Sequence, residues 1–302
     1  MKFFRISLLL LIPLFLLSGC GEPAELGSEK NPIKMYFVPS MEAGKIVTSA
    51  EEIAVYLEEK TGYSFKVAVP TSYASVIEAM GTKETDIAWL ATFAYILANE
   101  KFGAEVGLTT VRHGLEKYKG QFIARADSGI QNLEDIAGKT IAYTDAASTS
   151  GYIYPAAILK QKNIQPENYI FAGGHPQVVL SVYQGNADVG CTFWSPQADD
   201  GKIRDARYAV EETFPDVAEK VKIIGFTEWI PNDTVTFRKD FPAEMREQII
   251  EELLAYAKTE VGSETLVRLF QINDFVRGSD EDYDVVRETL RSIDADAADF
   301  MK

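Results

Sequence analysis

The chain has 302 residues, of which 46% are hydrophobic and 25% charged, proportions typical of a folded globular protein. Its formal net charge of −15 at pH 7 disfavours nucleic acid or an anionic lipid surface as a partner. The same charge opposes the capture of anions at long range, so any anion site must work through local donors.

The amino terminus is typical of an exported protein. The first 19 residues have the layout of a secretory signal, with Lys2 and Arg5 before an apolar run too short for a comfortable membrane span. The sequence Leu-Ser-Gly-Cys that ends at Cys20 resembles a bacterial lipobox, which predicts cleavage before this cysteine and its lipidation. Residues 20–31 are polar and aperiodic, so we expect a flexible tether there. These features predict a protein outside the cytoplasm, held to a membrane by lipid.

Strand-like and helix-like segments alternate along the rest of the chain. The pattern predicts strands at 34–38, 65–69, 86–90, 105–111 and 120–126, with helices at 50–60, 74–80 and 93–101. A second series runs from Thr140 to about residue 225, and after Asp240 the pattern is nearly all helical, at 243–258, 263–270 and 283–292. This alternation predicts an α/β fold with mainly parallel sheets flanked by helices. Cys191, the only other cysteine, is expected to be a buried and inert thiol.

The two series contain a faint copy of one another. Tyr73 begins a predicted helix that leads to Asp86 at the start of a strand, and His175 leads to Asp188 in the same way, with a spacing of 13 residues in both. Two similar lobes that face each other form a cleft, lined by loops at the carboxyl ends of parallel strands. We therefore expect Tyr73 and His175 to lie at a cleft.

Three consecutive hydroxyl residues, Ser148, Thr149 and Ser150, precede Gly151 at the point where a helix is expected to begin. The first N–H groups of a helix lack internal partners and carry partial positive charge. Together with the hydroxyls, they predict a socket for a small oxyanion such as phosphate, phosphonate or sulfate. The alternative is an ordinary helix cap, which needs only one hydroxyl.

An ordered set of short motifs resembles the phosphate, phosphite and phosphonate solute-binding proteins of ABC importers, a branch of the two-lobed type II periplasmic binding proteins. The matching pieces cover nearly the whole mature chain and lie at 71–73, 86–95, 133–139, 148–155, 175, 185–188 and 230–233. The resemblance implies a ligand cleft between two lobes. It also implies a first lobe of residues 32–125 and 226–302, a second lobe of residues 126–225, and hinges near Ala126 and Phe226.

The resemblance also implies the ligand residues and the partners. Ser148, Thr149 and Ser150 match the hydroxyls that hold the oxyanion. Tyr95 and Tyr73 match donors from the opposite lobe, although each also suits a core position. His175 matches a neutral donor; with only one other histidine in the chain, no metal site or cofactor is expected. The implied partners are a small phosphorus oxyanion and an ABC permease, with the binding protein itself a monomer.

Asp233 is the unexpected member of this set, because a carboxylate beside a bound anion repels it unless the ligand carries a proton that the carboxylate accepts. Phosphate and phosphonate monoanions carry such a proton and sulfate does not, so Asp233 predicts selection against sulfate. The alternative is a simple turn at residues 231–233.

The sequence departs from the family pattern near residue 195. Family members that bind amino-alkylphosphonates carry a second acidic residue for the ligand ammonium, and that position falls on or near Ser195. Asp199 and Asp200 remain alternatives for this role, while Phe193 and Trp194 suit either a pocket wall or the core. The departure favours phosphite, phosphate or methylphosphonate as the ligand.

Other functional classes were weighed against this interpretation. The chain has none of the common hydrolase or metalloprotease motifs, which disfavours an enzyme, although a spatial pair of His175 with the serine run stays open. A ligand-sensing module for a membrane receptor would have the same fold. Sulfonate, nitrate or a thiamine precursor would suit related two-lobed proteins, but these ligands need no acceptor such as Asp233.

Overall fold

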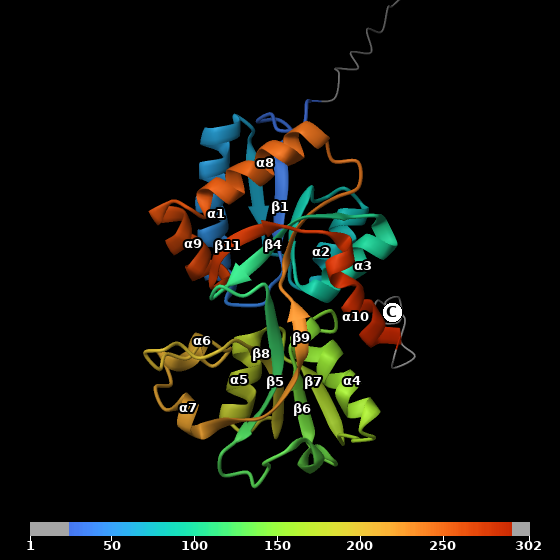
Figure 1. Ribbon diagram of the computed structural model, residues 1–302, viewed down its shortest axis with the longest axis vertical. Helices are drawn as coiled ribbons and strands as arrows, with labels where there is room; N and C mark the ends of the chain where they lie inside the picture. Colours follow the sequence, from blue (N-terminus) through green and yellow to red (C-terminus); the bar gives the residue numbers. More distant parts are fainter. Residues whose placement is uncertain (1–23, 292–302) are drawn as a thin grey trace, which may run out of the picture.

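The computed structural model describes residues 24–291, which form two lobes, each built around one sheet (Figure 1). The first sheet has the strand order β11-β4-β10-β3-β1-β2 and the second has the order β7-β6-β8-β5-β9. Each sheet is flanked by helices, as the alternating sequence pattern predicts. Cys20 and the proposed signal segment lie outside the described residues.

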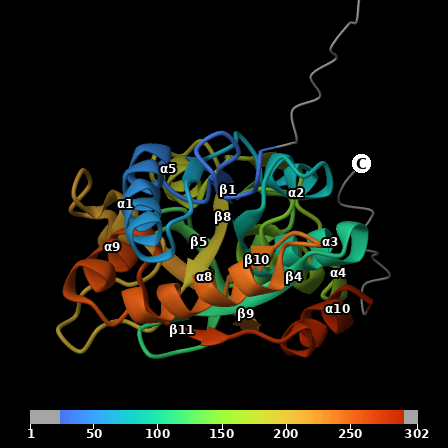
Figure 2. The ribbon, with the colours of Figure 1, turned by 90° about the horizontal axis from the view of Figure 1, so that it is seen from above.

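The first lobe combines segments from both ends of the chain. Its strands are β1 (Ile33–Phe37), β2 (Phe65–Ala68), β3 (Ile87–Leu90), β4 (Glu105–Arg112), β10 (Thr234–Phe237) and β11 (Ile272–Arg277). Its helices are α1 (Ala43–Thr61), α2 (Tyr73–Gly81), α3 (Thr92–Phe102), α8 (Ala243–Tyr256), α9 (Glu260–Phe270) and α10 (Asp284–Arg291). Helices α1 and α9 pack together on one side of this lobe, and α2 and α3 pack together on the other (Figure 2).

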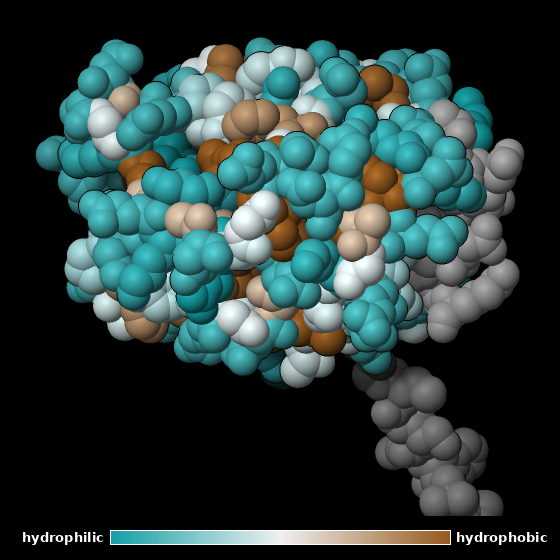
Figure 3. Space-filling model, turned by 90° about the horizontal axis from the view of Figure 1, so that it is seen from below, coloured by the Kyte–Doolittle hydropathy of each residue, from teal (hydrophilic) through white to brown (hydrophobic). Residues whose placement is uncertain are grey.

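The second lobe is formed by one continuous segment. Its strands are β5 (Lys117–Arg125), β6 (Thr140–Tyr143), β7 (Asn168–Phe171), β8 (Val189–Trp194) and β9 (Val221–Pro231). Its helices are α4 (Tyr154–Gln161), α5 (His175–Tyr183), α6 (Tyr208–Glu211) and α7 (Val217–Lys220), and a π-helical turn, Thr149–Ile153, leads into α4. The outer face of this lobe presents mainly hydrophilic side chains, with apolar ones scattered among them (Figure 3).

The internal repeat seen in the sequence has a structural counterpart. Helices α2 and α5 each have nine residues, and each leads into a central strand of its sheet. The Asp86 carboxylate accepts a hydrogen bond of 2.9 Å from the backbone N–H of Lys34, and Asp188 accepts one of 2.9 Å from Thr140 in the same way. The two aspartates therefore anchor equivalent strands in the two lobes.

Both sheets are mixed, which corrects the prediction of mainly parallel sheets. Strand β1 is parallel to β2 and β3, and β6 is parallel to β7 and β8. The strands next to the two crossings pair in antiparallel fashion: β10 against β3 and β4, and β5 against β8 and β9. The sequence pattern predicts a nearly all-helical region after Asp240, but six residues of this region form the edge strand β11, which pairs with β4.

The strand pairing also corrects the expected lobe boundaries at residues 125 and 226. Strands β5 and β9 pair with each other in the second sheet, so the chain crosses between the lobes at residues 113–116 and again at residues 232–233. Asn232 joins the two crossings, because its Nδ2 donates to the carbonyls of Thr110 (2.9 Å) and Leu115 (2.8 Å). A hinge motion of the lobes would centre on these segments, not on Ala126 and Phe226.

The described part of the expected tether, residues 24–31, is not an extended linker. The backbone N–H of Gly27 donates to Asn31, and its carbonyl accepts from Ser64, which fixes this segment as a turn against the first lobe. Leu26 packs against the core of that lobe. Within the described residues, no helix is long and apolar enough to cross a membrane. Cys191 is a buried free thiol, in line with its expected inert role.

Candidate ligand-binding site

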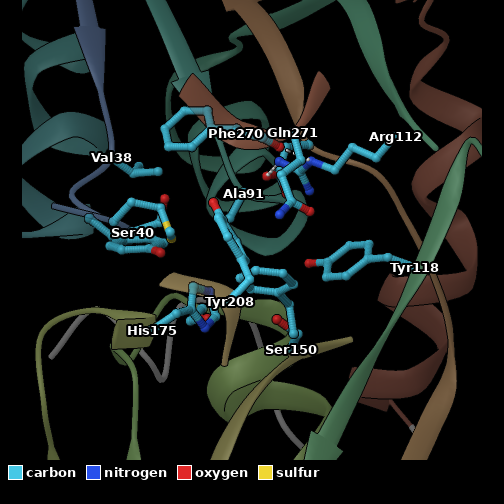
Figure 4. Close-up of a pocket in the computed structure, with 15 residues that line it drawn as sticks. Val38, Ser40, Ala91, Arg112, Tyr118, Ser150, His175, Tyr208, Phe270 and Gln271 are labelled. Carbon is cyan, nitrogen blue, oxygen red and sulfur yellow. Dashed lines mark hydrogen bonds and ion pairs between the residues drawn. The ribbon is translucent and has the colours of Figure 1, made fainter. Parts of the chain in front are cut away.

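A small cavity lies between the two lobes and is lined by residues from both (Figure 4). The space open to the centre of a water molecule is about 40 Å³, whereas a single water needs roughly 10–15 Å³ on this measure. The cavity therefore suits a group of a few non-hydrogen atoms. The first lobe contributes Val38, Ser40, Met41, Tyr73, Ala91, Arg112, Asp233, Phe270 and Gln271, and the second contributes Tyr118, Ser148, Ser150, His175, Phe193 and Tyr208.

The serine run lies at the start of the π-helical turn that follows β6. Ser148 caps this turn, since its Oγ accepts a hydrogen bond of 3.1 Å from the N–H of Gly151. A Cβ atom on Gly151 would lie 2.2 Å from Oγ1 of Thr144, so only glycine lets the turn pack so closely on the end of β6. Ser148 and Ser150 both line the cavity, as the sequence predicts.

Thr149 differs from its two neighbours, and its expected side-chain role in the socket is wrong. Its Oγ1 is turned to the first lobe, where it accepts a hydrogen bond of 2.8 Å from the N–H of Phe93 in the first turn of α3. Thr149 is therefore not among the residues that line the cavity. Consecutive residues of a helical turn face different directions, so three adjacent hydroxyls do not all converge on one ligand.

The cavity is lined by Tyr208 and by two further tyrosines, Tyr73 and Tyr118. Tyr73 begins α2, as the sequence predicts, and lines the cavity beside Ser40. Tyr118 lies on β5, with its hydroxyl directed into the cavity (Figure 4). Burial raises the pKa of both phenols, so each keeps its proton and its capacity to donate at neutral pH.

Tyr95 does not reach the cavity, so its expected role as a ligand donor is wrong. It is fully buried in the first lobe, with its ring edge-on to Tyr283 at 4.8 Å. Its hydroxyl donates to Asp280 at 2.6 Å, and Asp280 is in turn paired with Arg287 at 2.7 Å. The core position weighed as an alternative is the correct one. The place expected for Tyr95 is taken by Tyr118, for which the sequence offers no motif.

His175 lies at the first position of α5 with its ring in the cavity wall. Its Nδ1 is 2.7 Å from Oγ1 of Thr192 and 3.2 Å from Oγ1 of Thr144. Burial, with a smaller effect of the Arg112 charge, lowers the pKa of His175 to about 3. The imidazole is therefore neutral at physiological pH, as expected for a donor without charge.

An ion pair in the cavity wall adds a charged group that the sequence analysis missed. The Nη2 of Arg112, the last residue of β4, donates to Oδ2 of Asp233 at 2.5 Å. Asp233 thus lies in the cavity wall as predicted, but it already has one cationic partner. The sequence feature that could have identified Arg112 is its position at the carboxyl end of a buried strand, because such strand ends line clefts in α/β folds.

The remaining wall is largely apolar. Phe193 lines the cavity, whereas Trp194 packs outside it against Phe226, with ring centroids 5.0 Å apart. Ser195 is not a lining residue, and neither Asp199 nor Asp200 takes the place of a second acid. Among the described residues that line the cavity, Asp233 is thus the sole carboxylate. No cluster of three or more potential metal ligands occurs within residues 24–291.

Direct hydrogen bonds join the lobes around the cavity. Besides the bond from Phe93 to Thr149, the N–H of His175 donates to the carbonyl of Ser40 at 3.0 Å. One apolar cluster also contains residues of both lobes, among them Tyr118 and Ile153 from the second and Phe93 from the first. The structure thus represents a closed arrangement, in which the cavity is shielded by contacts between the lobes.

Comparisons with known proteins identify a family and several relatives of this chain. Residues 35–283 match the family described as the periplasmic substrate-binding protein of phosphonate ABC transporters. The phosphate-import protein PhnD of Mycolicibacterium smegmatis is 30% identical over 192 residues, covering 58% of this chain and 60% of the relative. The phosphonates-binding periplasmic protein of Escherichia coli is 26% identical over 221 residues, covering 70% of this chain and 62% of the relative. Both alignments thus span less than two thirds of the relatives' lengths.

The fold is also found among solved structures. The binding protein component of an ABC phosphonate transporter from Pseudomonas aeruginosa has a TM-score of 0.75 and 23% identity, and the alignment covers 86% of each chain. This likeness shows a shared two-lobed fold.

Proposed function

This chain belongs to the family of periplasmic substrate-binding proteins of phosphonate ABC transporters, and we propose that it captures a small phosphorus oxyanion by closure of its two lobes. The observation that carries the proposal is the cavity of about 40 Å³ between the lobes, with hydroxyl donors on one side and an arginine–aspartate pair on the other. Phosphite, phosphate and methylphosphonate are the ligands of suitable size.

The donors are neutral groups. Ser148, Ser150, Tyr73 and Tyr118 supply hydroxyls, and His175 supplies an uncharged ring N–H. Hydrogen bonds from such groups to an anion are charge-assisted and contribute roughly 1.5–3 kcal/mol each. The proposed site therefore binds an anion through local bonds, in spite of the net charge of −15 on the chain.

Asp233 gives the proposed site its selectivity against sulfate. One of its oxygens is held by Arg112, while Oδ1 has no hydrogen-bond partner among residues 24–291. A phosphorus oxyacid with a P–OH group donates its proton to this oxygen, whereas sulfate at neutral pH has no proton to offer. Sulfate would therefore leave Oδ1 without a donor and would bring its own negative oxygens against it, although Arg112 holds the other oxygen.

The proposed setting combines the family with the lipobox-like sequence that ends at Cys20. We propose an extracytoplasmic protein anchored through Cys20 that delivers its ligand to an ABC permease. The names of the two relatives, one importing phosphate and the other binding phosphonates, support a phosphorus oxyanion as cargo. A catalytic role has less support, because Nδ1 of His175 is engaged by threonine hydroxyls and not by a carboxylate that would orient a general base.

The test is the affinity of the mature protein for methylphosphonate and phosphite, measured by titration calorimetry on the wild type and on Ser150→Ala. The loss of one charge-assisted bond should weaken binding roughly 10- to 150-fold. Ser181→Ala is the matched control, since the Ser181 hydroxyl donates to Gln177 within α5, outside the cavity, and its variant should bind like the wild type. Equal affinities of the Ser150 variant and the wild type would show that the Ser150 hydroxyl does not bind the ligand and would contradict the proposed site.

A further inference from the structure

The guanidinium of Arg112 is held firmly at the cavity wall. Its Nη2 bonds to Asp233 at 2.5 Å, and its Nε donates to the carbonyl of Phe270 at 2.9 Å. Its Cζ lies 5.9 Å from the ring centroid of Tyr118, within the range of a cation–π contact. Phe270 is the last residue of α9, where the helix dipole places partial negative charge that favours a cation.

This positive charge is permanent and close to any ligand. The side chain of Arg112 is only 12% exposed, and that of Asp233 is 24% exposed, so solvent screens the pair weakly. An arginine keeps its proton under all physiological conditions. The pair is formally neutral, and the cavity wall thus contains one positive and one negative charge before a ligand arrives.

The pairing determines which ligand charges the cavity tolerates. A lone carboxylate in such a small anion site would best be matched by a ligand that brings its own cation, such as an ammonium group. Here Asp233 has that cation from the protein, so a ligand ammonium would approach Arg112 as a like charge. The surrounding wall from Val38, Phe193 and Phe270 is apolar and suits a methyl or P–H group instead.

We propose that Arg112 is a specificity-determining residue that restricts the site to phosphorus oxyanions without an amino group. It acts by neutralising the charge of Asp233 through Oδ2 and by repelling a ligand ammonium. This inference rests on the proposed function, because it assumes that the phosphorus group occupies the cavity between the lobes.

The effect of a ligand ammonium can be separated from the effect of ligand shape by comparing two phosphonates of nearly equal size. Ethylphosphonate and aminomethylphosphonate differ by a methyl group in place of an ammonium, and titration calorimetry at pH 7 gives the affinity ratio of the pair. The wild type should prefer ethylphosphonate at least tenfold. In Arg112→Gln, Asp233 loses its cation, and the ratio should reverse in favour of aminomethylphosphonate. In the double variant Arg112→Gln with Asp233→Asn, the wall carries no charge and the advantage of the amine should disappear.

A matched control is the pair Arg238–Asp86, which is similarly buried and lies outside the cavity. Arg238→Gln should leave the ligand ratio of the wild type unchanged. The inference is overturned if the wild type binds both ligands equally, if it binds neither while methylphosphonate binds, or if Arg112→Gln folds and keeps the wild-type ratio. If Arg112→Gln fails to fold, the affinity ratio of the wild type decides the inference: a preference of at least tenfold for ethylphosphonate supports it, and equal affinities overturn it. Absence of binding for methylphosphonate, phosphite and phosphate would instead refute the proposed function.

Discussion

The hydrogen bond from Phe93 to Thr149 predicts that a residue outside the cavity controls ligand affinity. Thr149 Oγ1 accepts the N–H of Phe93 at 2.8 Å across the two lobes, and both residues are buried. Thr149→Val keeps the shape of the side chain and removes the acceptor. In an open form, water replaces the lost bond, so the substitution destabilises only the closed form. A buried hydrogen bond of this kind contributes about 1–3 kcal/mol.

The expected result is a roughly 5- to 150-fold weaker affinity for methylphosphonate, because ligand binding must now supply the lost closure energy. Calorimetry measures the affinity, and small-angle scattering with saturating ligand tests whether the lobes still close. Thr149→Ser is the matched control, since it keeps the hydroxyl and should stay near the wild-type affinity. If Thr149→Val binds as tightly as the wild type, the interlobe bond does not contribute to closure and this reasoning is wrong.

Three further predictions concern stability and, in one case, ligand affinity. Asn232→Ala removes two buried bonds at the crossings and should lower the free energy of unfolding by about 2–4 kcal/mol, measured by urea denaturation. Tyr95→Phe should reduce stability by about 1 kcal/mol yet leave ligand affinity unchanged by calorimetry, since its hydroxyl bonds to Asp280, away from the cavity. The pKa of His175 is about 3 in the folded chain and about 6.5 when unfolded, so between these values only the unfolded chain takes up the proton. The stability of the wild type should therefore fall by up to about 1.4 kcal/mol per pH unit as the pH drops below 6.5, and more steeply than that of His175→Gln; parallel urea midpoints for the two proteins from pH 7 to 5 would contradict the buried neutral imidazole.

The sequence was sufficient for features that depend on local patterns. The alternation of strands and helices and the matching positions of Asp86 and Asp188 predicted two similar lobes, because each aspartate terminates the same kind of turn before a central strand. The lobe boundaries were not predictable in this way. Only four residues separate β4 from β5, and only two separate β9 from β10, so no long linker marks the points where the chain changes lobe.

The binding site was only partly predictable for a similar reason. Helix starts identified Ser148, Ser150, Tyr73 and His175, which the structure brings together around one cavity. The direction of the Thr149 side chain and the core position of Tyr95 depend on contacts between distant elements.

Arg112 is separated from Asp233 by 121 positions in the chain. Its neighbours in the sequence match no motif, so no local pattern connects the two residues. Only the folded first lobe, which brings the end of β4 beside the second crossing, forms the pair.

The central claim is that the cavity binds a phosphorus oxyanion and rejects sulfate, and one titration series tests it directly. Calorimetry of the wild type at pH 7 with phosphate, phosphite, methylphosphonate and sulfate should give a Kd of about 10 µM or tighter for at least one phosphorus ligand. Sulfate should bind at least ~100-fold more weakly, which corresponds to about 2.7 kcal/mol. Equal or tighter binding of sulfate, or no binding of any of the three phosphorus ligands, would contradict the account.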